Sequence, residues 1–109
     1  MDINSKEISV NGIKYFICQD GQEIARAYLY ILHNDLHEKP FGFMEDVNVL
    51  EAFQRRGIGP TLINRIIEEA KRRDCYKLIC TSRDENVNVH RLYERLGFKD
   101  YGIEFRINL

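Results

Sequence analysis

The hydrophobic period of this chain changes near residue 58. Beyond this point apolar residues recur at steps of three and four, and charged residues fill the positions between them. The apolar stripe comprises Ile58, Leu62, Ile63, Ile66, Ile67 and Ala70. Pro60 suits the first turn of a helix, and the basic residues 71–73 face the negative end of the helix dipole. The pattern therefore predicts an amphipathic helix with a marked start and end.

The first fifty residues have the pattern of strands separated by turns. The dipeptides Asn11-Gly12 and Asp20-Gly21 favour two-residue hairpin turns, because these residue types tolerate positive φ angles. Apolar runs flank the two dipeptides at residues 8–10 and 13–17 and again from residue 23, and a fourth run covers residues 41–49. We therefore expect a four-stranded antiparallel meander in this part of the chain.

The elements after the helix complete the expected fold. Leu78-Ile79-Cys80 is typical of a buried strand, and residues 101–109 alternate like a further strand. A second apolar helical stripe lies between them, formed by Val89, Leu92, Tyr93 and Leu96 and ended by Gly97. The order is β-β-β-β-α-β-α-β, and its crossover requires a parallel strand pair. We expect an α/β fold, a mixed and mostly antiparallel sheet flanked by helices, as one domain over residues 1–109.

Composition narrows the classes of function. Apolar residues make up 44% and charged residues 30% of the chain, and the net charge is -1, so neither disorder nor a basic nucleic-acid surface is indicated. No apolar run approaches the roughly 20 residues that span a bilayer, and the chain does not begin with a signal-peptide core. We expect a cytoplasmic protein with neither nucleic-acid nor membrane partners.

The spacing of the cysteines and histidines does not predict a metal site. Cys18, Cys75 and Cys80 lack the paired short spacing of zinc ligands and are expected to be reduced structural thiols. His33 and His37 are four residues apart, but the preceding run 27–32 has the pattern of a strand, which would not align them as a helix does.

Residues 54–59, Gln-Arg-Arg-Gly-Ile-Gly, join a strand to the helix and are the candidate functional loop. Unpaired N–H groups and the positive end of the dipole make a helix N-terminus a ready anion site, and glycines let the backbone approach a ligand. A tight connection without a ligand would use the same residues. A dinucleotide-binding fold requires a third glycine at the position where this chain has Leu62. A P-loop requires Gly-Lys-Ser/Thr, which is absent, so both kinds of nucleotide site are disfavoured.

Two segments together resemble the GNAT superfamily of N-acetyltransferases. Gln54, Gly57 and Gly59 match its cofactor motif Gln/Arg-x-x-Gly-x-Gly/Ala, and the preceding strand Val47-Asn48-Val49 matches as well. Downstream, the segment from Asn86 to Phe98 resembles the family's Asn-x-x-Ala-x-x-Leu-Tyr-Glu-Lys-x-Gly-Phe, with Val89 in place of the alanine. The resemblance covers about residues 41–109, whereas the first forty residues fit the family only in being rich in strands.

The resemblance implies acetyl-CoA as cosubstrate and no metal. The pantetheine arm would pair with the backbone of Val47, Asn48 and Val49, and Asn86 would make a further contact. The pyrophosphate would rest on the motif that begins at Gln54, over Arg55, Arg56, Gly57, Ile58, Gly59 and Pro60. An amine of the acceptor would attack the thioester directly, which needs a base, an oxyanion donor and an acid. Tyr93 is the family's candidate acid and also a cofactor contact, and its position on the helical stripe also allows a packed aromatic.

The general base is not assigned by the resemblance. Many relatives that acetylate protein N-termini have a glutamate where this chain has Thr81, and threonine is no base at neutral pH. Glu45 and Asp46 are the nearest carboxylates, on a strand that resembles that of glucosamine-phosphate N-acetyltransferases. Glu45 is the preferred candidate, while His90, or a chain of waters reaching bulk solvent, is an alternative.

The N-terminal part departs from the family, because relatives usually carry one or two helices after the first strand and only Asn11-Gly12 intervenes here. Those helices normally wall the acceptor site. Their lack suggests an open groove for a peptide amine or a site completed in a homodimer. An alternative function is an acyl-CoA-binding module without catalysis, which the threonine at position 81 would fit. The acceptor amine, a small molecule or a peptide, is not identified by the sequence.

Overall fold

The computed structural model describes residues 1–109 and contains one four-stranded sheet in the order β1-β2-β3-β4. β1 (Asn11–Gln19), β2 (Gln22–Leu32) and β3 (Phe41–Val49) are antiparallel neighbours. β4 (Leu78–Ile79) pairs with β3 in parallel. The sheet is therefore mixed and mostly antiparallel, and the predicted fold class is confirmed.

The connection between β1 and β2 confirms one predicted turn and corrects the other. Asp20 and Gly21 have φ angles of 52° and 78°, as a two-residue hairpin turn of this kind requires. The expected turn at Asn11-Gly12 is wrong, because both residues belong to β1 and pair with Ile31 and Tyr30 of β2. A Cβ on Gly12 would lie 3.2 Å from the ring of Tyr30, so the glycine makes room for that ring.

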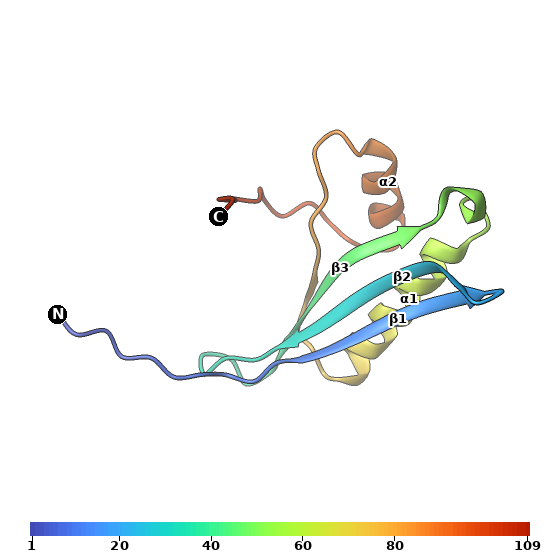
Figure 1. Cartoon of the computed structure of the whole chain (residues 1–109). Coiled ribbons are helices and arrows are strands. Elements are labelled where there is room, and N and C mark those ends of the chain that lie inside the picture. The colour runs from blue at the N-terminus through green and yellow to red at the C-terminus, as the bar shows by residue number, and fades with distance from the viewer. The chain divides into compact units, whose positions relative to one another are not determined.

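The predicted four-stranded meander therefore has three strands, since no strand forms at residues 8–10. β2 is eleven residues long and offers pairing partners as far as Asn11, where β1 begins. The preceding residues 1–10 are all exposed and lead from the N-terminus to the start of β1 (Figure 1).

The amphipathic helix predicted from residue 58 is confirmed as α1 (Ile58–Arg72), and it follows a short 3₁₀ helix, η1 (Glu51–Phe53). α1 lies against one face of the sheet, with contacts to β2 and β3 (Figure 1). The residues buried in this layer are Ile24, Ala25, Ala27, Leu29, Ile31, Met44, Leu62, Ile63, Ile66 and Ala70. Truncating a fully buried aliphatic side chain such as Ile63 or Ile66 typically costs about 2–5 kcal/mol, so this layer supplies much of the stability.

The crossover through α1 brings β4 beside β3 in the expected parallel pair. Gly42 and Phe43 of β3 are in register with Leu78 and Ile79, and the Gly42 N–H donates to the Lys77 carbonyl at 2.9 Å. A Cβ on Gly42 would lie 2.9 Å from Leu78 Cδ1, so only glycine allows this close approach.

Residues 1–79 and 80–109 form two compact units. The second unit contains α2 (Val87–Arg95), which confirms the second predicted helix. Gly97, with a φ of 107°, follows it as the expected C′ residue. The strand expected at residues 101–109 is wrong. Its alternating side chains are exposed and no ladder pairs them, and a strand needs a partner for its backbone groups.

That the whole chain forms one domain stays a prediction. None of the helices is both long and apolar enough to cross a membrane. The compartment in which the protein works stays a prediction as well.

Candidate functional site

The end of β3 is distorted by a bulge at the position of the predicted site. Arg26 pairs with Asn48, and Tyr28 pairs with Glu45. An advance of two residues along β2 is therefore matched by an advance of three residues along β3. The extra residue is accommodated at Asp46, whose φ of 51° lies in the left-handed region that aspartate tolerates better than most residues. A bulge leaves backbone groups outside the ladder and bends the strand. Beyond it, Val47 and Val49 are half-buried and Asn48 is exposed.

The loop from Gln54 to Gly59 is tethered at its first residue. Gln54 donates from Nε2 to the Val49 carbonyl at 2.9 Å, which ties the loop to the end of β3. Arg55 has a φ of 65° and Gly57 a φ of 80°, so the chain reverses through two left-handed residues before α1 begins. A Cβ on Gly57 would meet no atom within 4 Å, and that side of the loop is open.

The first turn of α1, which follows Gly57, carries free backbone donors. Gly57 is the N-cap, and its carbonyl accepts from the Thr61 N–H at 3.2 Å and from Thr61 Oγ1 at 2.7 Å. The N–H groups of Ile58 and Gly59 lie in the first turn of the helix, where no helical carbonyl is available to accept their hydrogen bonds. Pro60 has no N–H. The helix start can therefore hold an anion through these N–H groups and the dipole.

The arginines of the loop differ in their surroundings. The Arg56 guanidinium lies 5.3 Å from the centroid of the Phe53 ring, which holds it against η1. Arg55 lines a cavity of about 240 Å³ together with Glu51 and Gln54. The loop thus combines backbone donors, one stacked cation and a cation beside a small cavity.

In residues 80–109, the end of α2 is fixed by a Schellman motif. The Phe98 N–H donates to the Tyr93 carbonyl at 2.9 Å and the Gly97 N–H to the Glu94 carbonyl at 3.0 Å. The Tyr93 and Phe98 rings pack with centroids 5.4 Å apart, the hydrophobic contact that usually accompanies this motif. The motif sets the position of Tyr93 on α2.

The hydroxyl of Tyr93 is a weak acid. Burial, with a smaller contribution from the Cys80 thiolate, raises the pKa of Tyr93 to about 12, and burial raises the pKa of the Cys80 thiol to about 11. Both groups are therefore protonated at neutral pH. Tyr93 has the protonation state of a proton donor and not of a base.

Asn86 and His90 are the other predicted residues of this unit. Asn86 is the N-cap of α2, yet its side chain makes no capping hydrogen bond, which leaves the amide for another partner. His90 is engaged, because its Nε2 lies 2.9 Å from the Arg83 carbonyl oxygen. Thr81 is exposed and carries no group that could accept a proton at neutral pH. Glu45 and Asp46 of the first unit are exposed carboxylates on β3.

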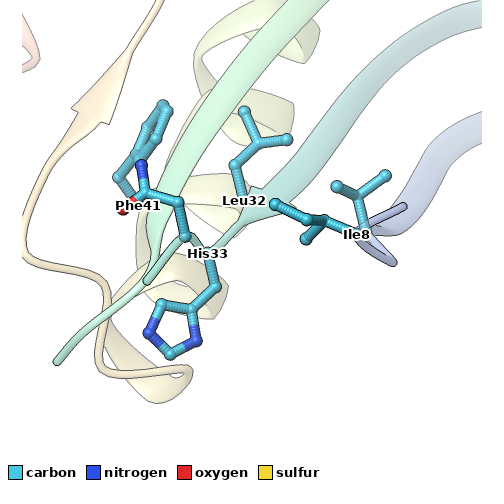
Figure 2. A pocket seen from close by; sticks show the side chains of 6 residues that line it. Ile8, Leu32, His33 and Phe41 are labelled. Atoms are coloured by element: carbon cyan, nitrogen blue, oxygen red, sulfur yellow. The ribbon is translucent and has the colours of Figure 1, made fainter. Parts of the chain in front are cut away.

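A second cavity lies at the opposite end of β3, roughly 25 Å from the loop along the nine-residue strand. Its volume is about 270 Å³, and Figure 2 shows Leu32 and Phe41 from the two strands with Ile8 of the N-terminal segment beside them. The sequence did not predict it, because residues far apart in the chain form it. The rim residue His33 bonds through Nε2 with the His37 carbonyl oxygen at 2.8 Å, a contact between side chain and backbone. All three cysteines are free thiols.

Comparison with known proteins gives one family. The model described as the acetyltransferase (GNAT) family matches residues 3–98. The glucosamine 6-phosphate N-acetyltransferase of Candida albicans is 33% identical over 85 residues, which are 77% of this chain and 55% of that protein. The aminoglycoside N(6')-acetyltransferase type 1 of Acinetobacter haemolyticus is 31% identical over 67 residues, 62% of this chain and 46% of that protein.

The fold has solved counterparts. The crystal structure of a Trypanosoma brucei acetyltransferase superposes with a TM-score of 0.81 at 27% identity, covering 90% of this chain and 69% of that one. The chain spans about half the length of the curated relatives it matches. The matched span contains both the loop of the first unit and α2 of the second.

Proposed function

The chain belongs to the acetyltransferase (GNAT) family, and from this premise we propose that it transfers an acetyl group from acetyl-CoA to a primary amine by direct attack. The observation that carries the proposal is the loop before α1, where Gly57 is left-handed and open on the side of the helix N-terminus.

The donor side of the site is assigned to residues that fit a pyrophosphate. The N–H groups of Ile58 and Gly59 point toward the helix start, where an anion is favoured by the dipole. A Cβ at position 57 would project into open space at the N-cap, and a glycine leaves that space to the ligand. Arg55 and Arg56 add positive charge. We assign the backbone beyond the bulge, at Val47 to Val49, to the pantetheine arm, and the Asn86 amide, which makes no capping hydrogen bond, to a further contact.

Acetyl-CoA, when bound, supplies an activated acyl group: the amine nitrogen bonds to the carbonyl carbon, the C–S bond breaks, and the products are an amide and CoA thiol. The chain must take one proton from the amine and give one to the leaving sulfur. We assign proton donation to Tyr93, whose pKa of about 12 keeps it protonated. Glu45 is the proposed base because it is an exposed carboxylate at the bulge and beside the proposed acyl end of the cofactor.

The acceptor is proposed to be an amine-bearing small molecule or peptide, and a homodimer is proposed as one way to complete its site. Two of the relatives are named for glucosamine 6-phosphate and aminoglycoside acceptors, so amino sugars are the first class of acceptor to test. The second candidate, an acyl-CoA-binding module without turnover, is favoured by one observation: Thr81 has no carboxylate.

One experiment separates the two functions. Release of CoA thiol is followed with pools of amino sugars, aminoglycosides, polyamines and peptides, and CoA affinity is measured by calorimetry on the same preparation. Transfer with any pool supports the enzyme, whereas tight CoA binding without transfer supports the module. Glu45→Gln is compared with Asp46→Asn as a matched pair, since only the first should lose transfer. A gel-filtration mass of one chain, with transfer retained, would exclude the homodimer.

A further inference from the structure

The face of the sheet that points away from α1, here called the outer face, is unusually rich in aromatic rings. In β1, β2 and β3 it carries Lys14, Phe16, Arg26, Tyr28, Tyr30, Leu32, Phe41, Phe43 and Glu45. No helix of residues 1–79 covers this face, and Phe16 is 56% exposed. The other rings of this face are half-buried, and contiguous aromatic surface that stays accessible is a candidate binding site.

An ammonium group already lies on these rings. Lys14 Nζ is 5.2 Å from the centroid of Phe16 and 5.8 Å from that of Tyr28, both within the range of cation–π attraction. The same nitrogen bonds the Glu23 carboxylate, whose other oxygen lies 3.8 Å from Arg26 Nη1. The bond to Glu23 is the main reason that the pKa of Lys14 is raised. Two rings and one carboxylate thus form a complete environment for an alkylammonium ion.

The Lys14 side chain can leave this environment at small cost. It is exposed, and exposed ion pairs and cation–π contacts are among the weakest interactions in proteins. Its departure leaves Glu23 with only the longer contact to Arg26. The Tyr28 and Tyr30 rings, 6.5 Å apart and inclined by 8°, extend the aromatic surface along β2. A ligand ammonium would find the same partners that Lys14 uses.

The strand register connects this environment with the proposed base. Lys14 pairs with Tyr28, and Tyr28 pairs with Glu45, so the three residues form one row across the outer face. Neighbouring strands are about 4.8 Å apart, so the backbones at Lys14 and Glu45 are about 10 Å apart. An acceptor whose reacting amine lies at Glu45 would reach the Lys14 position with a second nitrogen at that spacing.

We propose that Phe16, Tyr28 and Glu23 form a subsite for a second, non-reacting ammonium group of the acceptor, and that Lys14 occupies this subsite when no acceptor is bound. The acceptor class is then a diamine or polyamine with nitrogens about 10 Å apart, counted over two strand spacings. The assignment rests on the proposed function, because Glu45 marks the reacting amine only if acetyl transfer occurs.

The test uses linear diamines of graded length, from ethylenediamine to decanediamine, each beside the monoamine of equal length. Lys14→Thr vacates the subsite and keeps a residue suited to strands. It should lower the KM of the long diamines by about tenfold, which corresponds to about 1.4 kcal/mol. The KM of the monoamines should not change. Phe16→Leu and Glu23→Gln should raise the KM of the same diamines.

Tyr76→Leu is the matched control, since it also removes an exposed ring with a lysine above it, Lys77 Nζ at 5.3 Å from the centroid. It lies outside the row and should leave the diamine preference intact. Binding of heptanediamine, whose extended chain places the nitrogens at the proposed spacing, to the CoA-bound chain is measured by calorimetry and tests the subsite even if no amine is acetylated. Equal affinities for wild type, Lys14→Thr and Phe16→Leu would overturn the subsite, whereas absence of turnover with the predicted affinity changes would overturn only the proposed function.

Discussion

Replacing Gly57 by alanine tests the donor loop most directly. Gly57 caps α1 with a φ of 80°, and a Cβ there would meet no atom within 4 Å. The substitution therefore strains the backbone without a clash. Gly21, in the turn between β1 and β2, is a matched control because its φ is 78° and its Cβ would also meet nothing within 4 Å.

The expected loss of stability follows from these angles. The left-handed region costs an L-residue roughly 1–2 kcal/mol, and the reduced freedom of the unfolded chain offsets roughly 0.4–1 kcal/mol of this. The net loss is about 1 kcal/mol, which lowers the melting temperature by about 4–8 °C in a domain of this size class. Gly57→Ala and Gly21→Ala should lose the same amount.

The two variants should differ only when CoA is present. At 100 times its dissociation constant a ligand raises the free energy of unfolding by about 2.7 kcal/mol. Gly21→Ala should keep this increment, because its methyl group lies outside the loop. Gly57→Ala should bind CoA about tenfold more weakly, or about 1.4 kcal/mol, because its methyl group fills the space beside the first-turn N–H groups. Melting curves with and without CoA, together with calorimetry, measure both effects.

Two results would refute this reasoning. If Gly57→Ala binds CoA as tightly as wild type, the loop is not the pyrophosphate site. If Gly21→Ala loses as much CoA affinity as Gly57→Ala, the loss reflects general destabilisation and not the loop.

Three further predictions concern packing, chemistry and pH. Gly42→Ala should lower the free energy of unfolding by about 1–3 kcal/mol in chemical denaturation, because its Cβ would lie 2.9 Å from Leu78 Cδ1. Adding Leu78→Ala should remove part of this penalty, and strictly additive losses in the double variant would contradict the clash. Tyr93→Phe should keep CoA binding but slow thiol release about a hundredfold, and an unchanged kcat would exclude the hydroxyl as the acid. Hydrogen bonds from Arg72 and its neighbouring arginine lower the pKa of Glu69 to about 2 from 4.5, so its contribution to stability is present above pH 4.5 and lost as the pH falls toward 2. Glu69→Gln should therefore show a shallower loss of stability over this range, and identical pH curves would argue against the ion pairs.

The elements that the sequence predicted well are those set by local rules. α1 follows from the spacing of its apolar residues, and the turn at Asp20-Gly21 follows from two residues that accept positive φ. Asn11-Gly12 obeys the same local rule and was wrong, because a longer partner strand incorporates both residues into the ladder. The tail at 101–109 shows the converse, since its alternation is correct for a strand but no neighbouring strand pairs with it.

The donor side and the acceptor side of the proposed site also differ in how far the sequence could predict them. The donor loop is continuous in sequence, and its left-handed glycine and tethering glutamine act within a few residues of each other. The row of Lys14, Tyr28 and Glu45 instead depends on one hairpin turn and one bulge. Because side chains alternate between the faces of a strand, a register slip of one residue would turn Lys14 toward α1 and bring Tyr15 into the row. No pattern within a single strand reveals that alignment, so an acceptor subsite of this kind becomes visible only once the register is known.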